Sequence, residues 1–318
     1  MSDSMKLVQY GRYGKPSVLH EATAERPTVT AEHVLVRVHG SSVNHLDVTI
    51  RSGLVRVVSG FAFPKGSGLD FAGEIVSVGE GAEGYSVGDR VWGFLPGLPG
   101  GAIGAASEYL NAPLGSFSIA PSTGELRDAS ALPLVASTAL VALRDRGHLS
   151  EGDRLLVRGA AGGVGTAAVQ LGKALGARVT AMAGIHDLDF VRELGADDAL
   201  DYRTHGPGQV GDFEVILDLV GTRLRGYRRH LAPHGRIIST AVRAAPFIAA
   251  SVVYGPRRVR TLVISPSPEV LTDVAGYVER GQLTPVIERV YPLRDAAAAH
   301  TAVEKGVGRG KHVIDVRA

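Results

Sequence analysis

The chain has 318 residues, which is enough for one or two domains with substantial cores. Hydrophobic residues make up 45% of it and charged residues 21%, as in an ordinary globular protein. Its net charge of +2 is too small to indicate a nucleic-acid partner by itself, and we expect none. The absence of cysteine excludes disulfides, thiolate catalysis and cysteine-ligated zinc.

The N-terminal residues 1–10 lack the apolar core of a signal peptide, and no apolar run in the sequence approaches the length of a membrane span. A chain without cysteine also fits a reducing compartment. We therefore expect a cytoplasmic protein with no membrane partner.

Residues 5–120 have the pattern of a compact barrel of short strands. Apolar residues alternate or cluster in short runs, and Gly or Pro separates one run from the next. The predicted strands are Met5–Tyr10, His33–His39, Glu74–Gly79 and Arg90–Gly93.

Residues 54–67 are unusually apolar for a connection between strands. Two interpretations are about equal on the sequence alone. The segment could cover an active site with apolar surface and favour a bulky hydrophobic substrate. It could also be a helix or loop packed under the barrel.

The middle of the chain has the alternation of a doubly wound parallel sheet. A long helix is predicted for Asp128–Leu143, bent at Pro133. Helical segments, among them Asp187–Leu194, then alternate with short apolar runs. The predicted strands after residue 150 are Leu155–Val157, Arg178–Ala183, Ala199–Arg203, Phe213–Gly221, Gly235–Thr240 and Arg260–Ile264.

A glycine-rich turn follows the first of these strands. The turn contains Gly159, Gly162, Gly163 and Gly165, and a run of small helix-forming residues comes after it. Without side chains, the backbone can approach a pyrophosphate closely, and the N–H groups at the helix start favour its negative charge. The sequence therefore predicts dinucleotide binding here.

Several motifs together resemble one family. The string Ala160-Ala161-Gly162-Gly163-Val164-Gly165 stands between Gly152-Asp153 and Gln170, and G-x-D-x-x-G spans Gly68–Gly73. A G-D-x-V turn follows at Gly88–Val91. This arrangement resembles the zeta-crystallin-like quinone oxidoreductases of the medium-chain dehydrogenase/reductase superfamily, over nearly the whole chain. The resemblance implies a GroES-like β-barrel catalytic domain (1–122 and 269–318) and a Rossmann nucleotide-binding domain (123–268).

The same resemblance implies a site without zinc. Zinc alcohol dehydrogenases of this superfamily have Cys near position 44 and a His-Glu pair near 69 and 70, whereas this chain has Asn44, Leu69 and Asp70. A carboxylate without thiolate or imidazole partners is a poor zinc ligand set. We therefore expect no catalytic metal.

The resemblance also supplies candidate site residues. Asn44 is a candidate for orienting a substrate carbonyl, and Asp47 is a second catalytic candidate that could equally be the N-terminal charge of a short helix. His45 is expected to be a solvated or hydrogen-bonded loop histidine. The implied coenzyme contacts are Asn44, Thr138, Ala160, Ala161, Gly162, Gly163, Val164, Gly165, Ala183, Tyr202, Val220, Thr240 and Lys311.

The choice between NADPH and NADH depends on the end of the strand Arg178–Ala183. NAD enzymes place an acid there for the ribose hydroxyls, but here Ala183 and Gly184 follow. The resemblance places Tyr202 and Arg203 near a 2′-phosphate, whereas Asp187 stands where the family has a lysine. NADP(H) is favoured over NAD(H).

The predicted activity is hydride transfer to a quinone, an enone or another small, apolar, electrophilic acceptor. Two alternatives remain open: a nucleotide-bound binding protein, crystallin-like or RNA-binding, and a zinc-free alcohol dehydrogenase. The RNA alternative rests on basic runs at Arg223–His230 and Arg257–Arg260. No set of aromatic residues for stacking accompanies them, which favours solvated surfaces instead. The family also implies a homodimer through the edge strand near Arg260–Ile264.

Overall fold

The computed structural model describes residues 4–97, 101–241, 244–251, 253, 259–306 and 308–318. The chain forms two compact units. The first comprises Met1–Leu134, Ser265–Glu279 and Pro285–Ala318, and the second comprises Val135–Ile264 and Arg280–Thr284. Of the predicted basic runs, Arg257 and Arg258 lie outside the described residues.

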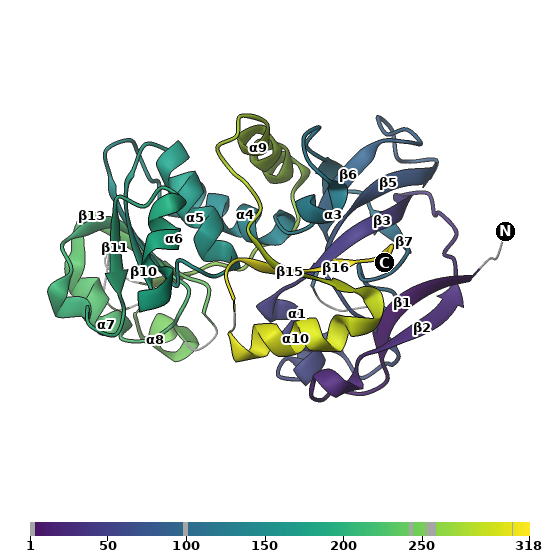
Figure 1. The fold of residues 1–318 in the computed structure, drawn as a ribbon, viewed down its shortest axis with the longest axis horizontal. Coiled ribbons are helices and arrows are strands. Elements are labelled where there is room, and N and C mark those ends of the chain that lie inside the picture. Colours follow the sequence, from purple (N-terminus) through teal and green to yellow (C-terminus); the bar gives the residue numbers. More distant parts are fainter. Residues whose placement is uncertain (1–3, 98–100, 242–243, 252, 254–258, 307) are drawn as a thin grey trace. The chain divides into compact units, whose positions relative to one another are not determined.

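The first unit is built on two sheets (Figure 1). The strands of the larger sheet follow the order β15 (Ile287–Pro292), β16 (Lys311–Asp315), β3 (His33–Val43), β5 (Asp70–Val78), β6 (Arg90–Phe94) and β8 (Phe117–Ile119), and β7 (Tyr109–Pro113) also pairs with β3. The smaller sheet has the order β2 (His20–Glu25), β1 (Ser4–Tyr10) and β4 (Lys65–Gly66). Because β16 pairs with β3, the end of the chain lies beside its first third.

Buried valine side chains of β3 lie in the core of this unit. Val34, Val36 and Val38 are buried, and they pack in one cluster with Phe71 of β5 and Phe117 of β8. The helices around the sheets are α1 (His45–Ser52), α2 (Arg56–Ser59), α3 (Leu126–Ala129), α9 (Pro268–Glu279) and α10 (Ala296–Lys305).

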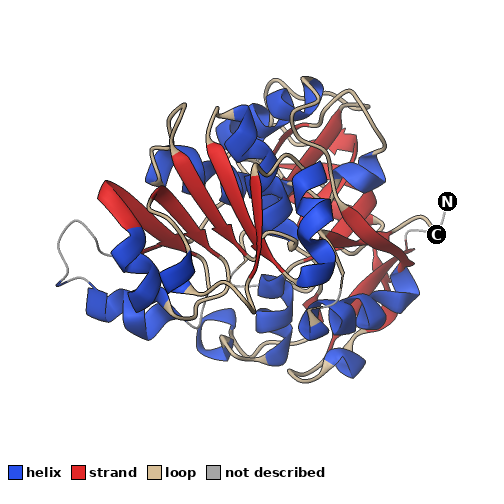
Figure 2. Ribbon diagram, turned by 60° about the vertical axis from the view of Figure 1, so that its left-hand side comes forward, coloured by secondary structure: helices blue, strands red, loops and turns tan. Residues whose placement is uncertain are grey.

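The second unit contains a parallel sheet (Figure 2, in which all strands of the chain are red). Its order is β11 (Asp198–Asp201), β10 (Arg178–Ala183), β9 (Arg154–Arg158), β12 (Phe213–Asp218), β13 (Leu231–Ser239) and β14 (Val259–Thr261). The strand order reverses between β9 and β12, and ligands of such sheets bind at the carboxyl ends of the strands at that point. The predicted doubly wound fold is confirmed.

The helices of the second unit include α5 (Gly163–Ala174), α6 (Leu188–Glu193), α7 (Leu224–Tyr227) and α8 (Ala245–Ala250). The long helix predicted for Asp128–Leu143 is wrong. It consists of α3, a separate helix α4 (Pro133–Leu140) and a π-helical segment at Val141–Arg146. Pro133 begins α4 instead of bending a longer helix, because a residue without an N–H fits the first helical position best.

Several other predicted boundaries also differ from the structure, for example β12, which ends at Asp218 and not at Gly221, and β13, which begins at Leu231 and not at Gly235. The predicted helix Asp187–Leu194 is a 3₁₀ turn at Ile185–Asp187 followed by α6. The predicted edge strand Arg260–Ile264 is shorter, since β14 pairs with β13 only through Thr261. Within the described ranges, no helix combines the length and apolar character that crossing a bilayer requires.

Candidate active site

The glycine turn joins β9 to α5 at the carboxyl edge of the parallel sheet. Gly159 has a left-handed backbone (φ +85°), and the N–H groups of Gly159 and Ala160 both donate to the Met182 carbonyl of β10, at 3.1 and 3.0 Å. Helix α5 then begins, with Gly162 as its N-cap. The turn is therefore fixed to the neighbouring strand on one side and to a helix start on the other.

Two glycines of the turn have different physical roles. A Cβ at Gly165 would lie 2.2 Å from the Gly159 carbonyl oxygen, so the helix can pack on the turn only without a side chain there. Gly162 is exposed, and a Cβ on it would meet only the Gly159 oxygen, at an ordinary 3.6 Å. The N–H groups of the first helical turn have no intrahelical acceptor. This bare backbone with free donors fits a pyrophosphate, as predicted from the sequence.

A buried ion pair braces the strand ends beside the turn. Arg158, the last residue of β9, pairs with Asp218, the last residue of β12, and its guanidinium lies 4.0 Å from the Tyr227 ring centroid. The Asp218 carboxylate also accepts hydrogen bonds from Ser239 Oγ at 2.7 Å and Gly221 N–H at 3.0 Å. This ion pair holds the loops that carry Val220 and Thr240, two of the predicted coenzyme contacts. The pair itself was not predicted from the sequence.

The end of β10 carries the groups that would distinguish NADPH from NADH. A Cβ on Gly184 would lie 3.6 Å from Asp187 Oδ2 and 3.8 Å from Tyr202 Cε1, so the carboxylate and the ring flank this glycine. The Tyr202 N–H donates to the Ala183 carbonyl at 3.1 Å, and the Arg203 guanidinium lies 5.7 Å from the Tyr202 ring centroid. The subsite therefore combines a phenol, one cation and one opposing carboxylate. Thr138, the remaining candidate of the second unit, is buried in α4.

The first unit holds a buried polar cluster of residues that lie far apart in the sequence. Asn44 caps α1, Asp70 begins β5 and Lys311 begins β16. Strand register brings them together, because Ser42 of β3 stands opposite Asp70 and Val43 stands opposite His312. All three are at least 95% buried.

Hydrogen bonds fix each group of the cluster. The Lys311 ammonium donates to the Val43 carbonyl at 3.0 Å, to Asn44 Oδ1 and to Asp70 Oδ2 at 3.4 Å. Asn44 Nδ2 donates to Asp70 Oδ2 at 2.8 Å and to the Ser42 carbonyl at 3.4 Å. An amide between an ammonium and a carboxylate has one favourable orientation, with its oxygen toward the cation.

This geometry constrains the predicted role of Asn44. Both of its N–H groups are engaged within the cluster, so they are not free to donate to a substrate carbonyl. Its Oδ1 accepts from the Lys311 ammonium, so the amide oxygen is also held within the cluster.

Asp47 lies at the third position of α1, where its carboxylate accepts the Asn44 N–H at 2.7 Å. Burial raises the pKa of Asp47 to about 7, and the negative charge of Asp70 adds to this. Burial lowers the pKa of Lys311, an effect that Asp70 and Asp47 oppose. His45 is exposed and is the first residue of α1, not a loop residue. Partial burial of its ring and the positive charge of Lys311 lower its pKa.

The cluster does not suit a divalent metal. The oxygens of Asn44 and Asp70 that could act as ligands already accept hydrogen bonds from the Lys311 ammonium, and Leu69 supplies no donor atom. Over the described part of the chain, no group of three or more His, Asp or Glu side chains is placed to hold a metal ion.

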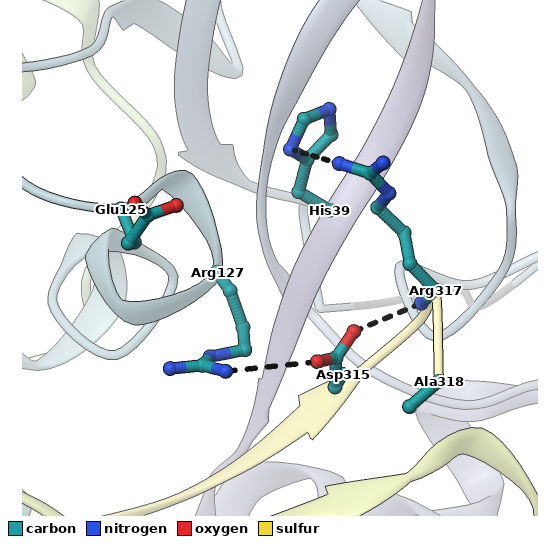
Figure 3. A pocket seen from close by; sticks show the side chains of 6 residues that line it. All are labelled: His39, Glu125, Arg127, Asp315, Arg317 and Ala318. Carbon is teal, nitrogen blue, oxygen red and sulfur yellow. Dashed lines mark hydrogen bonds and ion pairs between the residues drawn. The ribbon is translucent and has the colours of Figure 1, made fainter.

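A cavity of about 320 Å³ lies elsewhere in the first unit (Figure 3). It is lined by His39, Glu125, Arg127, Asp315, Arg317 and Ala318. Arg127 lies 3.7 Å from Asp315, and Arg317 Nη1 lies 3.4 Å from His39 Nδ1. The cavity contains none of the predicted site residues.

Two family models match parts of the chain. Residues 30–121 match the family model "Alcohol dehydrogenase GroES-like domain", and residues 194–314 match the model "Zinc-binding dehydrogenase". The predicted GroES-like fold is thereby confirmed. The zinc in the second description is not matched by the donors around Asn44 and Asp70.

Individual relatives match nearly the whole chain. The mouse protein "NAD(P)H oxidoreductase RTN4IP1, mitochondrial" is 30% identical, over 96% of this chain and 87% of the relative. A solved quinone oxidoreductase from Coxiella burnetii has a TM-score of 0.89 and 29% identity, over 99% of this chain and all of that chain. A solved NAD-dependent alcohol dehydrogenase has a TM-score of 0.86 and 30% identity, over 98% and 99%.

Proposed function

Because the chain belongs to the quinone oxidoreductases of the medium-chain dehydrogenase/reductase superfamily, we propose that it reduces a quinone, enone or other activated alkene with NAD(P)H and without zinc. The observation that carries this proposal is the turn at residues 159–165, where bare backbone and free N–H groups meet at the switch point of the parallel sheet. The bound coenzyme supplies the hydride. The residues proposed to hold it are the thirteen predicted contacts given above.

The chain's own contribution is electrostatic and positional. The Lys311 ammonium places a fixed positive charge beside Asn44, where it favours negative charge developing on the acceptor oxygen. Reduction by hydride also requires one proton. Asp47, whose pKa near 7 leaves it partly protonated at neutral pH, is the proposed donor.

The proposed activity is tested by following the absorbance of NADPH and NADH separately with purified protein. The acceptors are a panel of quinones, enones and enoyl thioesters. We expect oxidation of the coenzyme with at least one of these classes and no dependence on added zinc or on chelators. A protein that bound the coenzyme but oxidised it with none of the acceptors would instead favour the nucleotide-bound binding protein.

We propose NADPH as the preferred coenzyme, supported by Tyr202, Arg203 and the missing acid after Ala183. Asp187 opposes this preference, since its carboxylate lies beside the expected 2′-phosphate position. Replacing Asp187 with Asn should tighten NADPH binding about tenfold, because like charges at close range repel by about 1 kcal/mol or more, and leave NADH binding nearly unchanged. Fluorescence titration gives both dissociation constants.

Asp189→Asn is the matched control for this prediction. It removes the same charge two residues away, from a side chain that is 93% exposed and paired with Arg192. Equal tightening in both variants would mean that overall charge, not the position of Asp187, governs affinity for the phosphate.

The substrate is proposed to be apolar. Leu54, Val57, Val58 and Phe61 expose 61–87% of their surface, so these side chains are not packed under the barrel. Ser59 anchors the segment from inside, since its Oγ bonds Tyr13 Oη and its carbonyl accepts from Lys65 Nζ, both at 2.7 Å. An apolar surface that is held in place favours contact with an apolar ligand.

Replacing Val57 with Asp should raise KM for quinones with long alkyl tails about tenfold, while KM for small polar quinones changes little. The reason is the loss of roughly 1–2 kcal/mol of apolar contact. Val87→Asp introduces the same change at a side chain that is 67% exposed in the turn between β5 and β6. If both variants behave alike, the apolar segment does not contact the substrate.

A zinc-free alcohol dehydrogenase is the second candidate, supported by the 30% identity to an NAD-dependent alcohol dehydrogenase. Oxidation of alcohols with NAD, but no reduction of quinones or enones, would favour it. A homodimer through β14 and a cytoplasmic location stay proposals; size-exclusion chromatography with light scattering tests the first and cell fractionation the second.

A further inference from the structure

The Asp70 carboxylate lies at the centre of the polar cluster and is completely buried. Four donors from different parts of the chain converge on it. They are Ser42 Oγ at 2.6 Å, Asn44 Nδ2 at 2.8 Å, the Leu134 N–H at 2.9 Å and Lys311 Nζ at 3.4 Å. These donors stabilise the buried negative charge, and the carboxylate in turn fixes the direction in which each donor points.

We propose that Asp70 is the positioning residue of this site: it holds the Asn44 amide in one orientation and keeps the Lys311 ammonium charged, without touching the substrate itself. The inference rests on the proposed function, because it assigns a role within the same site. It goes beyond that function because the carboxylate is assigned neither to substrate nor to coenzyme.

The orientation of Asn44 follows from the two charges on either side of its amide. Asp70 Oδ2 accepts from Nδ2, and Lys311 donates to Oδ1. In Asp70→Asn, the side chain at position 70 is a neutral amide. Its NH₂ group could face Asn44 Nδ2 as readily as its oxygen could. The Asn44 amide would then populate both orientations, and Oδ1 would no longer face a single direction.

The charge of Lys311 depends on the same carboxylate. Burial disfavours the ammonium, and of the opposing groups Asp70 acts most strongly, followed by Asp47 of α1. The other ionisable group facing Lys311 from α1 is His45, whose pKa the lysine lowers. The Val43 carbonyl of β3, which accepts from Lys311, and Ile287, the β15 residue paired with Lys311 in register, carry no charge. Loss of Asp70 removes the main partner of a buried cation.

The test compares Asp70→Asn with Ser42→Ala, which removes one donor to Asp70 but no charge. We expect Asp70→Asn to lower kcat/KM for NADPH-dependent quinone reduction about a hundredfold, the loss typical of a misplaced catalytic group. Measured in an Asp47→Asn background, which lacks the limb that Asp47 sets, the remaining alkaline limit of the pH profile should move to lower pH on adding Asp70→Asn, because Lys311 loses its proton more readily. Ser42→Ala should leave that limit in place. An unchanged limit on adding Asp70→Asn would overturn the inference.

A second comparison protects the test against poor folding of the single variant. Lys311→Met and the double variant Asp70→Asn/Lys311→Met are measured beside it. Because the double variant leaves no unpaired buried charge, it should melt several degrees above Asp70→Asn, and its activity loss should be smaller than the product of the two single losses. Losses that multiply, or a double variant that melts below Asp70→Asn, would overturn the proposal.

Unfolding of the coenzyme-free protein separates this inference from the proposed function. A lysine whose folded pKa is lowered makes stability rise with pH between its folded and unfolded pKa values, since the unfolded chain binds more protons in that range. In Asp70→Asn this rise should begin at lower pH than in the wild type. If the wild type reduces no acceptor, the proposed function fails, and this measurement still reports whether Asp70 holds Lys311; an unchanged rise would overturn the inference alone.

Discussion

Replacing Gly165 with Val is expected to abolish measurable NADPH binding and to destabilise the protein by about 3 kcal/mol, the upper end of typical overpacking costs. Even a Cβ at this position would lie 2.2 Å from the Gly159 oxygen and 2.7 Å from backbone atoms of Ala160. Helix α5 would have to move off the turn, and the free N–H groups of its first turn would move with it. Thermal unfolding and calorimetric titration with NADPH measure the two effects.

Gly162→Ala is the matched variant that separates effects on the fold from effects on NADPH binding. Its Cβ meets the protein only at 3.6 Å, so the fold should be nearly unchanged apart from a modest N-cap effect. Its methyl group stands on the exposed surface of the turn, where the pyrophosphate must approach. We expect NADPH affinity to fall at least about tenfold, or about 1.4 kcal/mol. Wild-type affinity in Gly162→Ala would mean that the pyrophosphate lies elsewhere.

Replacing Asp47 with Asn is expected to lower kcat about a hundredfold, within the range found for loss of a general acid. In the wild type, kcat should fall as pH rises through about 7, because the carboxyl group loses the proton it donates. The variant should lack this limb of the profile. Asparagine can still accept the Asn44 N–H through its Oδ1, so the start of α1 is retained.

The control for Asp47 is Asp89→Asn. Asp89 accepts the N–H of Ser86, three residues earlier, at 2.8 Å, which is the same local geometry outside the cluster.

The pH dependence of the free energy of unfolding gives an independent check on the direction of the Asp47 pKa shift. With its folded pKa raised from 3.8 to about 7, Asp47 favours the folded state at low pH, and this contribution is lost as pH rises from 4 to 7. Asp47→Asn should flatten that fall; a wild-type pH dependence in the variant would contradict the assigned pKa.

The turn at 159–165 was predictable from sequence because its signals are local. A buried strand, a run of glycines and a helix of small residues stand within about twenty positions, and each has a direct backbone consequence. The strand Arg178–Ala183 was likewise predicted at its observed bounds. The break at Pro133 was missed because proline is compatible both with a kink and with a helix start, and only the preceding turn distinguishes them.

The polar cluster was predictable only in part. Asn44, Asp47 and Lys311 were identified by resemblance, but the role of Asp70 depends on the register of β3 with β5 and β16, which no local pattern encodes. Arg158 and Asp218 were missed for a related reason. A charge at the end of an apolar strand is ordinarily solvated, and only adjacent parallel strands bring these two into a buried pair.

Calorimetric titration of the purified wild-type protein with NADPH, repeated with Gly165→Val, tests the coenzyme site most directly. We predict saturable binding at one site per chain in the wild type and no saturation in the variant. No saturable heat with either NADPH or NADH in the wild type would contradict the assignment of residues 159–165 to a pyrophosphate, and so would undiminished binding in Gly165→Val.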